Sequence, residues 1–165
     1  MPAPLTAIRC MSVDSHRFTL DTNILVYALD GTAGIRHPLA QQIIQRAAHF
    51  DCFLTLQAVS EFYAVVTRKR LVNPQDAVAQ AVDWLELFPC VATSATAVRA
   101  ALADAAAGRA SYWDALLAAT AGEAGCLLML TEDLGDGTEL GGVRIHNPFG
   151  AAGSLTDEVG RLLDL

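Results

Sequence analysis

Short apolar segments alternate with helix-forming segments along most of this chain, and this alternation limits the possible folds more than any other feature. The apolar segments are expected to be strands over residues 18–20, 52–56, 88–92, 126–130 and 143–145. They consist almost entirely of apolar residues, which is typical of strands buried on both faces. Buried strands separated mostly by helices predict a three-layer α/β/α domain around a five-stranded, mostly parallel sheet.

The segments between these strands carry apolar residues at helical spacing. In residues 38–50, for example, Ile43 and Ala47 share one helical face. The strand predicted over 88–92 contains Pro89, which favours a position at the edge of the sheet. Helices are expected over residues 24–29, 38–50, 57–69, 74–87, 94–107 and 111–124.

The chain divides into three parts of unequal length. Residues 1–16 contain two prolines and little periodicity, so we predict a flexible N-terminal extension. Residues 17–150 are the predicted folded domain, and a length of 165 residues with 53% apolar residues is enough for one full core. Residues 151–165 form a C-terminal tail in which one short helix is expected from Thr156.

No apolar stretch approaches the roughly 18 residues that span a bilayer. The first residues also lack the apolar run of a signal peptide. The cytoplasm is therefore the expected location, without a membrane partner.

The cysteines and histidines are scattered and form no paired motif. Neither a C-x-x-C nor an H-E-x-x-H pattern occurs, so neither a zinc site nor a disulfide framework is expected. The residues concerned are Cys10, Cys52, Cys90, Cys126, His16, His37, His49 and His146.

The formal net charge of −7 argues against a protein that coats nucleic acid by bulk attraction. The net charge would not exclude nucleic-acid binding, however, if the carboxylates were concentrated in one metal site. Ten of the eleven basic residues are arginine, the side chain suited to bidentate phosphate contacts. The sequence is therefore compatible with a basic rim beside an acidic site.

Four acidic residues lie at strand ends or in the first turns of helices. Asp21 ends the first strand, and Asp133 follows the strand predicted over 126–130. Glu61 lies early in the helix after the second strand, and Asp114 lies in the first turn of the helix that leads into the fourth. Because parallel strands end at one edge of a sheet, and a helix leading into such a strand begins at that edge, we expect all four carboxylates in one cleft.

Four ionised carboxylates in one cleft repel each other and require a counter-charge. A cluster of hard oxygen ligands without cysteine or histidine favours Mg²⁺, with Mn²⁺ as the expected substitute. Each carboxylate taken singly also has a plain structural explanation, because helix caps and first helical turns favour acidic residues. The segment Ser111-Tyr112-Trp113-Asp114, for instance, matches a capping box.

Several other chemistries have no support in the sequence. There is no phosphate-binding G-x-x-x-x-G-K-[ST] loop, no complete dinucleotide-binding glycine motif and no G-x-S-x-G nucleophile. An aspartyl-phosphate mechanism would want a second Asp two residues after Asp21, where this chain has Asn23. Nucleophilic catalysis by Asp21 is therefore disfavoured.

These motifs together resemble the PIN-domain ribonucleases, and more narrowly the VapC toxins of bacterial type II toxin–antitoxin systems. The resemblance runs from Phe18 to Phe149. The segments that carry it are Leu20-Asp21-Thr22-Asn23, Ser60-Glu61, Tyr112-Trp113-Asp114-Ala115-Leu116, Leu130-Thr131-Glu132-Asp133-Leu134 and Asn147-Pro148-Phe149.

The resemblance implies a Mg²⁺-dependent endoribonuclease, usually a homodimer, that is neutralised by a VapB-type antitoxin. Asp21, Glu61, Asp114 and Asp133 would be the catalytic residues, and all of them except Glu61 are expected metal ligands. The supporting residues would be Thr22, Asn23, Thr131 and Asp136, the last as a fifth ligand acting through water.

Two other functions stay open at this point. One is a nuclease of the same fold that acts in RNA processing. The other is a catalytically silent module whose acidic groove binds basic partners and needs no metal.

Overall fold

A computed structural model describes residues 16–165 and contains one six-stranded sheet in the order β3-β2-β1-β4-β6-β5. Every pair of neighbouring strands is parallel except β5 with β6. The strands are β1 (Phe18–Leu20), β2 (Cys52–Thr55), β3 (Cys90–Val91), β4 (Leu128–Leu130), β5 (Glu139–Leu140) and β6 (Val143–His146). The predicted flexible extension, residues 1–16, lies outside the described residues apart from His16.

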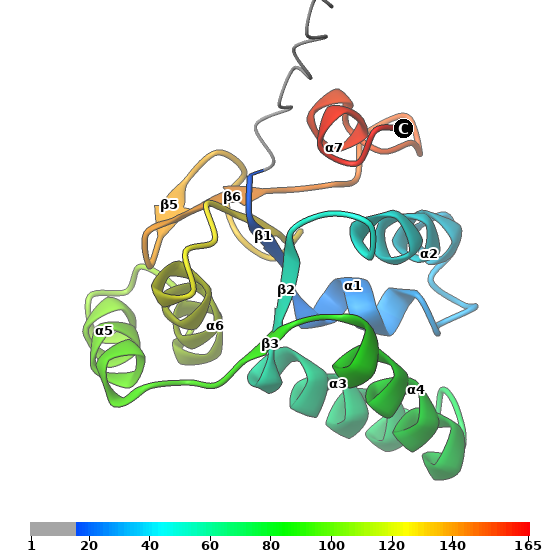
Figure 1. Cartoon of the computed structure of the whole chain (residues 1–165), viewed down its shortest axis with the longest axis horizontal. Coiled ribbons are helices and arrows are strands. Elements are labelled where there is room, and N and C mark those ends of the chain that lie inside the picture. Colours follow the sequence, from blue (N-terminus) through cyan, green and yellow to red (C-terminus); the bar gives the residue numbers. More distant parts are fainter. Residues whose placement is uncertain (1–15) are drawn as a thin grey trace, which may run out of the picture.

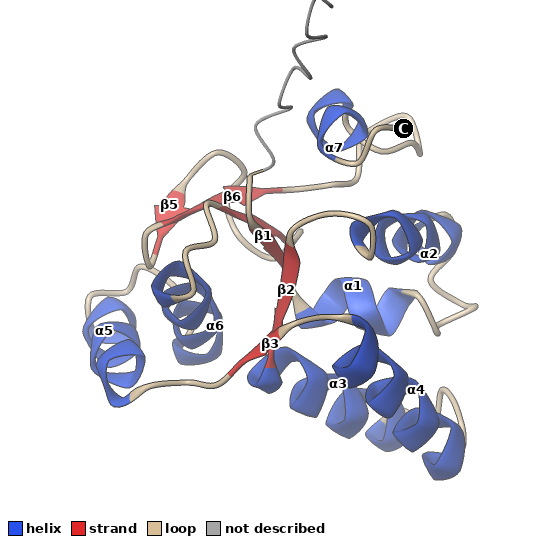
Figure 2. Cartoon of the chain, viewed as in Figure 1, coloured by secondary structure: helices blue, strands red, loops and turns tan. Residues whose placement is uncertain are grey.

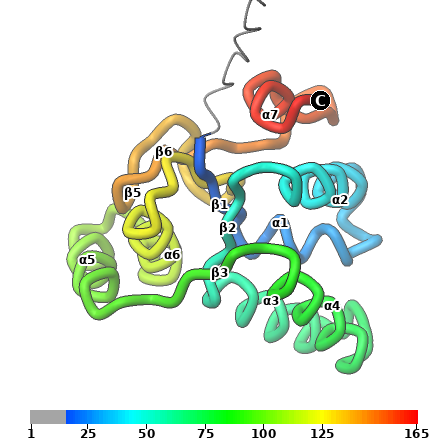
Figure 3. Tube along the Cα trace, viewed as in Figure 1, coloured from blue at the N-terminus to red at the C-terminus, as the bar shows by residue number. Residues whose placement is uncertain are grey.

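Helices cover both faces of this sheet, which confirms the predicted three-layer α/β/α fold class (Figure 1). The helices are α1 (Thr22–Tyr27), α2 (Arg36–Ala47), α3 (Leu56–Arg68), α4 (Pro74–Leu87), α5 (Ala95–Ala106), α6 (Tyr112–Glu123) and α7 (Asp157–Leu162). Figure 2 shows α5 and α6 on one side of the strands and α1 to α4 on the other. The chain changes sides by passing from α4 through β3, at the edge of the sheet, to α5 (Figure 3).

The sheet has one strand more than the five predicted. The additional strand, β5, has only two residues and lies between Gly137 and Gly141, where no strand is predicted from the sequence. It pairs antiparallel with β6 through a two-residue turn, Gly141-Gly142. Both glycines have positive φ, 59° and 82°, which the tight turns of hairpins require and which glycine adopts without strain.

The middle of helix α6 is buried on all sides because it lies between α5 and the sheet. Every residue from Ala115 to Ala121 is buried. Its last turn also lies close to the β5–β6 turn, where a Cβ atom added to Gly122 would come within 2.1 Å of the Gly141 carbonyl oxygen. This close approach places the end of α6 directly against the β5–β6 turn.

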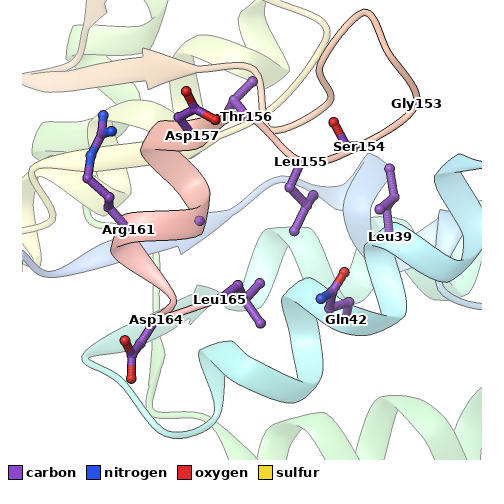
Figure 4. Close-up of a pocket in the computed structure, with 11 residues that line it drawn as sticks. Leu39, Gln42, Gly153, Ser154, Leu155, Thr156, Asp157, Arg161, Asp164 and Leu165 are labelled. Atoms are coloured by element: carbon purple, nitrogen blue, oxygen red, sulfur yellow. The ribbon is translucent and has the colours of Figure 1, made fainter.

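The C-terminal residues pack onto the same core as the sheet. Val159 and Leu163, in and directly after α7, are fully buried in the main hydrophobic cluster. A cavity of 770 Å³ lies between α2 and this segment, lined among others by Leu39, Gln42 and Leu165 (Figure 4). No helix within residues 16–165 is long and apolar enough to cross a membrane.

Candidate active site at the carboxyl edge of the sheet

Asp21 lies at the end of β1 and caps the start of α1. Its Oδ1 accepts a hydrogen bond from the amide of Thr22 at 2.6 Å, and its Oδ2 accepts one from the Thr131 hydroxyl at 2.6 Å. The side chain is buried, with 7% of its surface exposed. Burial raises the pKa of Asp21 from 3.8 to about 6, against the effect of both hydrogen bonds, and the charges of Asp133 and Asp114 add to the rise.

Asp133 follows β4, the parallel neighbour of β1, so the two strands end side by side. Its Oδ2 accepts a hydrogen bond from the Asn23 amide group at 3.0 Å. The same Asn23 nitrogen donates to the Thr131 hydroxyl at 3.3 Å, and the Asp133 backbone amide donates to that hydroxyl at 3.1 Å. Asn23 and Thr131 therefore join the segment after β1 to the segment after β4.

Asp114 lies in the first turn of α6, close enough to Asp21 for its charge to contribute to the raised pKa of Asp21. Ser111 is the N-cap of this helix and accepts a hydrogen bond from the Asp114 amide at 3.2 Å. The Ser111 hydroxyl in turn donates to Asp114 Oδ2 at 2.6 Å. The serine that starts the helix thus also orients the carboxylate.

Glu61 lies in the second turn of α3, which begins directly after β2. Gln57, four residues earlier, donates from Nε2 to Glu61 Oε1 at 2.7 Å. The same nitrogen donates to the carbonyl oxygen of Trp113 at 2.9 Å. Glu61 is thereby connected to the start of α6, one residue before Asp114.

Two of the predicted supporting residues have partners outside the four carboxylates. The Thr22 hydroxyl lies 3.5 Å from the Ala58 carbonyl oxygen and so connects α1 to α3, while its backbone amide binds Asp21. Asp136 accepts a hydrogen bond from the Asn147 amide at 2.9 Å, and its Oδ1 lies 3.1 Å from His146 Nδ1. Asp136 therefore lies against β6 and, within residues 16–165, shares no hydrogen bond with the four carboxylates.

The adjacent acidic residues Glu132 and Asp133 have different surroundings. Glu132 accepts hydrogen bonds from Arg36 Nε at 2.7 Å and from the Tyr27 hydroxyl. Burial and the neighbouring Glu132 raise the pKa of Tyr27, so its hydroxyl stays protonated and donates. The charge of Glu132 is therefore paired, in contrast to that of Asp133.

None of the four carboxylates forms an ion pair within the described part of the chain. Each is held instead by a neutral donor, which orients the carboxylate without cancelling its charge. These carboxylate and donor pairs are Asp21 with Thr131, Asp133 with Asn23, Asp114 with Ser111, and Glu61 with Gln57. Glu61, Asp114 and Asp133 each have a second carboxylate oxygen that has no hydrogen-bond partner among residues 16–165.

This arrangement fits a divalent cation. The available donors are carboxylate oxygens, the ligands that Mg²⁺ and Mn²⁺ prefer. Burial of an ionised Asp21 near two like charges is unfavourable until a positive charge arrives. Among the described residues no three His, Cys, Asp or Glu side chains are already arranged around one metal position, so binding would draw the carboxylates together.

The model of the PIN domain family matches residues 18–135, a stretch that contains all four carboxylates and all four of their donors. The chain belongs to the PIN domain family. No curated protein sequence matches it significantly. Nucleases of this family generally use divalent metal ions.

Solved structures of VapC proteins share this PIN fold at low sequence identity. VapC20 of Mycobacterium tuberculosis, described as a sarcin–ricin loop cleaving toxin, is 17% identical with a TM-score of 0.55, over 68% of this chain and 86% of VapC20. VapBC2 from Rickettsia felis, bound to a promoter DNA fragment, is 14% identical with a TM-score of 0.59, over 79% and 97%. DNA-bound VapBC from Salmonella typhimurium is 16% identical with a TM-score of 0.57, over 79% and 96%.

Sequence reasoning missed two residues that hold carboxylates. Ser111 was recognised only as part of a capping box, although a capping serine can also donate back to the acidic residue three positions later. Gln57 was not recognised at all. Its signal was its position four residues before Glu61, because side chains at this spacing are neighbours on a helix.

Proposed function

We propose that this PIN domain protein is a divalent-metal-dependent endoribonuclease and the toxin component of a type II toxin–antitoxin module. The observation that carries the proposal is the set of four carboxylates at one sheet edge, each held by a neutral donor and none paired with a cation among residues 16–165. A silent structural site would gain stability from an arginine or lysine at this position. Unpaired negative charge is useful where a metal cation must bind.

In this proposal Asp21, Asp114 and Asp133 hold Mg²⁺, with Mn²⁺ as a substitute. A bound metal ion would polarise the phosphate and lower the pKa of the attacking water. Glu61 would be a catalytic residue and would accept a proton from the attacking water, through its Oε2 atom, which has no hydrogen-bond partner among residues 16–165. Asn23 and Thr131 keep the carboxylates of Asp133 and Asp21 in place.

The proposed partners are an RNA substrate, a VapB-type antitoxin and a second copy of this chain. The fold shared with VapBC assemblies from two bacteria supports the antitoxin. The fold shared with VapC20, described as a toxin that cleaves the sarcin–ricin loop, supports an RNA substrate. We expect the protein to act in the cytoplasm.

RNA cleavage by purified protein tests the proposal. We expect Mg²⁺-dependent cleavage by the wild type, loss of cleavage on addition of a chelator, and a decrease of at least about 100-fold in Asp21→Asn. Asp83→Asn is the matched control, because Asp83 is exposed on α4 and forms no ion pair within residues 16–165. Equal cleavage by the wild type and Asp21→Asn would contradict the proposal.

A further inference from the structure

Two buried side-chain oxygens in the described part of the chain have no hydrogen-bond partner, Asn23 Oδ1 and Gln57 Oε1. Both belong to amide groups that hold a carboxylate of the candidate site. A buried acceptor without a partner is unfavourable for folding and calls for an explanation. Asn23 is part of the motif that begins with Asp21, whereas Gln57 belongs to no motif.

The orientation of the Gln57 amide group follows from its partners. Its nitrogen contacts Glu61 Oε1 at 2.7 Å and the Trp113 carbonyl oxygen at 2.9 Å, and both of these atoms can only accept. Exchanging the amide nitrogen and oxygen would place three acceptors together. The unpartnered Oε1 is therefore a consequence of directing both N–H groups at these two oxygens.

We propose that Gln57 is a positioning residue for the Glu61 carboxylate, an inference that rests on the proposed nuclease function. Glu61 has a long side chain and is only half-buried, so without a partner it would sample several rotamers. Gln57 holds the Oε1 atom of Glu61 one helical turn away, while Glu61 Oε2 has no hydrogen-bond partner among residues 16–165. The contact with Trp113 fixes this arrangement relative to the first turn of α6, where Asp114 lies.

The neutrality of Gln57 matters as much as its reach. A lysine or arginine at this position could also hold Glu61, but it would cancel the negative charge that the site offers to a cation. A methionine of similar size would avoid the unpartnered oxygen and would suit a half-buried position. Glutamine orients the carboxylate and keeps its charge, as serine, threonine and asparagine do for Asp114, Asp21 and Asp133.

Calorimetric titration with Mg²⁺, in the absence of RNA, tests this role in Gln57→Met. We expect Mg²⁺ affinity to fall by up to about tenfold, because Glu61, although not one of the three proposed ligands, adds its negative charge to the site and Gln57 keeps that charge in place. The melting temperature of the metal-free protein should stay equal or rise, because the unpartnered oxygen is removed. Gln57→Asn, which keeps the amide but is one methylene shorter, should lose Mg²⁺ affinity to a similar extent.

Gln80→Met is the matched control, since Gln80 is a half-buried glutamine of α4 and lies beside Trp84 rather than the carboxylates. It should leave Mg²⁺ affinity unchanged. With RNA present, Gln57→Met should lower kcat with little change in KM, because Gln57 Oε1 is buried and its amide nitrogen is occupied by Glu61 and Trp113.

A double-mutant cycle separates positioning from an independent structural effect. If Gln57 acts through Glu61, then Gln57→Met combined with Glu61→Gln should bind Mg²⁺ no more weakly than Glu61→Gln alone. Two results would contradict the positioning role of Gln57 without contradicting the proposed nuclease function. One is an additive loss of Mg²⁺ affinity in the double variant, and the other is a Gln57→Met protein that binds Mg²⁺ as the wild type does. A wild type that neither binds Mg²⁺ nor cleaves RNA would overturn the proposed function and this inference with it.

Discussion

Asp21 is the residue at which stability and the proposed chemistry oppose each other. It is buried at the end of β1, where an apolar side chain would pack without any electrostatic cost. Burial and two nearby like charges raise its pKa to about 6, so the carboxylate is ionised at neutral pH only at the expense of folding free energy. Such a cost is expected where a cation is to bind.

The pH dependence of stability in Asp21→Asn follows from this pKa. Because the pKa of Asp21 is higher in the folded state than in the unfolded state, ionisation destabilises the fold above pH 6, and this cost disappears as the pH falls to 3.8. We expect metal-free Asp21→Asn to be more stable than the wild type at pH 7.5 by up to about 3 kcal/mol. The gain should vanish near pH 4.

Urea unfolding at several pH values, with a chelator present, measures this difference. Asp83→Asn should show no comparable gain at any pH, because Asp83 is exposed. A lower stability of Asp21→Asn at pH 7.5 would mean that the hydrogen bonds to Thr22 and Thr131 outweigh the cost of burial.

Helix α6 connects a carboxylate of the candidate site to a tight backbone contact at its other end. Its first turn carries Asp114 and its last turn lies against the β5–β6 turn. A displacement at the end of such a short, rigid helix would also move its beginning. The contact between Gly122 and Gly141 therefore contributes to the geometry of a carboxylate about two turns away.

Gly122→Ala should destabilise the protein although alanine is the better helix former. Helix propensity alone would favour the change by about 1 kcal/mol. The new Cβ atom would lie 2.1 Å from a backbone carbonyl oxygen that cannot move without shifting the turn. We expect a net loss of about 2 kcal/mol in the free energy of unfolding, together with slower RNA cleavage per folded molecule.

Gly31→Ala is the matched control for this substitution. Gly31 also has no positive φ, and a Cβ atom placed there would have no neighbour within 4 Å among residues 16–165. The free energy of unfolding of Gly31→Ala should differ from that of the wild type by no more than about 0.5 kcal/mol, when both glycine variants are measured by urea unfolding. Equal stability of the two variants would contradict a tight contact at Gly122.

The molecule as a whole folds around one main core that extends beyond the residues matched by the family model. The C-terminal segment follows residue 135, yet it contributes Val159 and Leu163 to the same hydrophobic cluster as the sheet. Arg46 of α2 holds this segment through the carbonyl oxygens of Leu163 and Asp164, at 3.0 and 2.9 Å. The segment therefore belongs to the folded domain.

Leu163→Ala should lower the free energy of unfolding by about 2–5 kcal/mol, because a fully buried leucine leaves a cavity. Leu165→Ala, two residues later and 50% exposed, should change it by less than about 0.5 kcal/mol. Thermal or urea unfolding of both variants checks this difference. RNA cleavage per folded molecule should be unchanged in both variants, since within residues 16–165 neither leucine contacts the carboxylates. A selective loss of cleavage in Leu163→Ala would contradict the expectation that this segment affects stability only.

Local patterns were sufficient for the fold class, and they also selected the candidate carboxylates, whose role stays a prediction. Apolar strands separated by helices predict a parallel sheet, and parallel strands bring their carboxyl ends to one edge whatever the details of packing. Residues as distant as Asp21 and Asp133 could therefore be grouped from their positions at the ends of β1 and β4. The two-residue strand β5 escaped prediction because so short a segment has no periodicity.

The surroundings of each carboxylate depended on packing between segments far apart in the chain. Asn23 and Asp133 are 110 residues apart, and Gln57 reaches Trp113 across 56 residues. Helical periodicity and turn preferences act over a few neighbouring residues, so they do not specify such pairs. For the same reason, the pairing of Glu132 with Arg36, the place of Asp136 against β6 and the burial that raises the pKa of Asp21 arise only when the chain has folded.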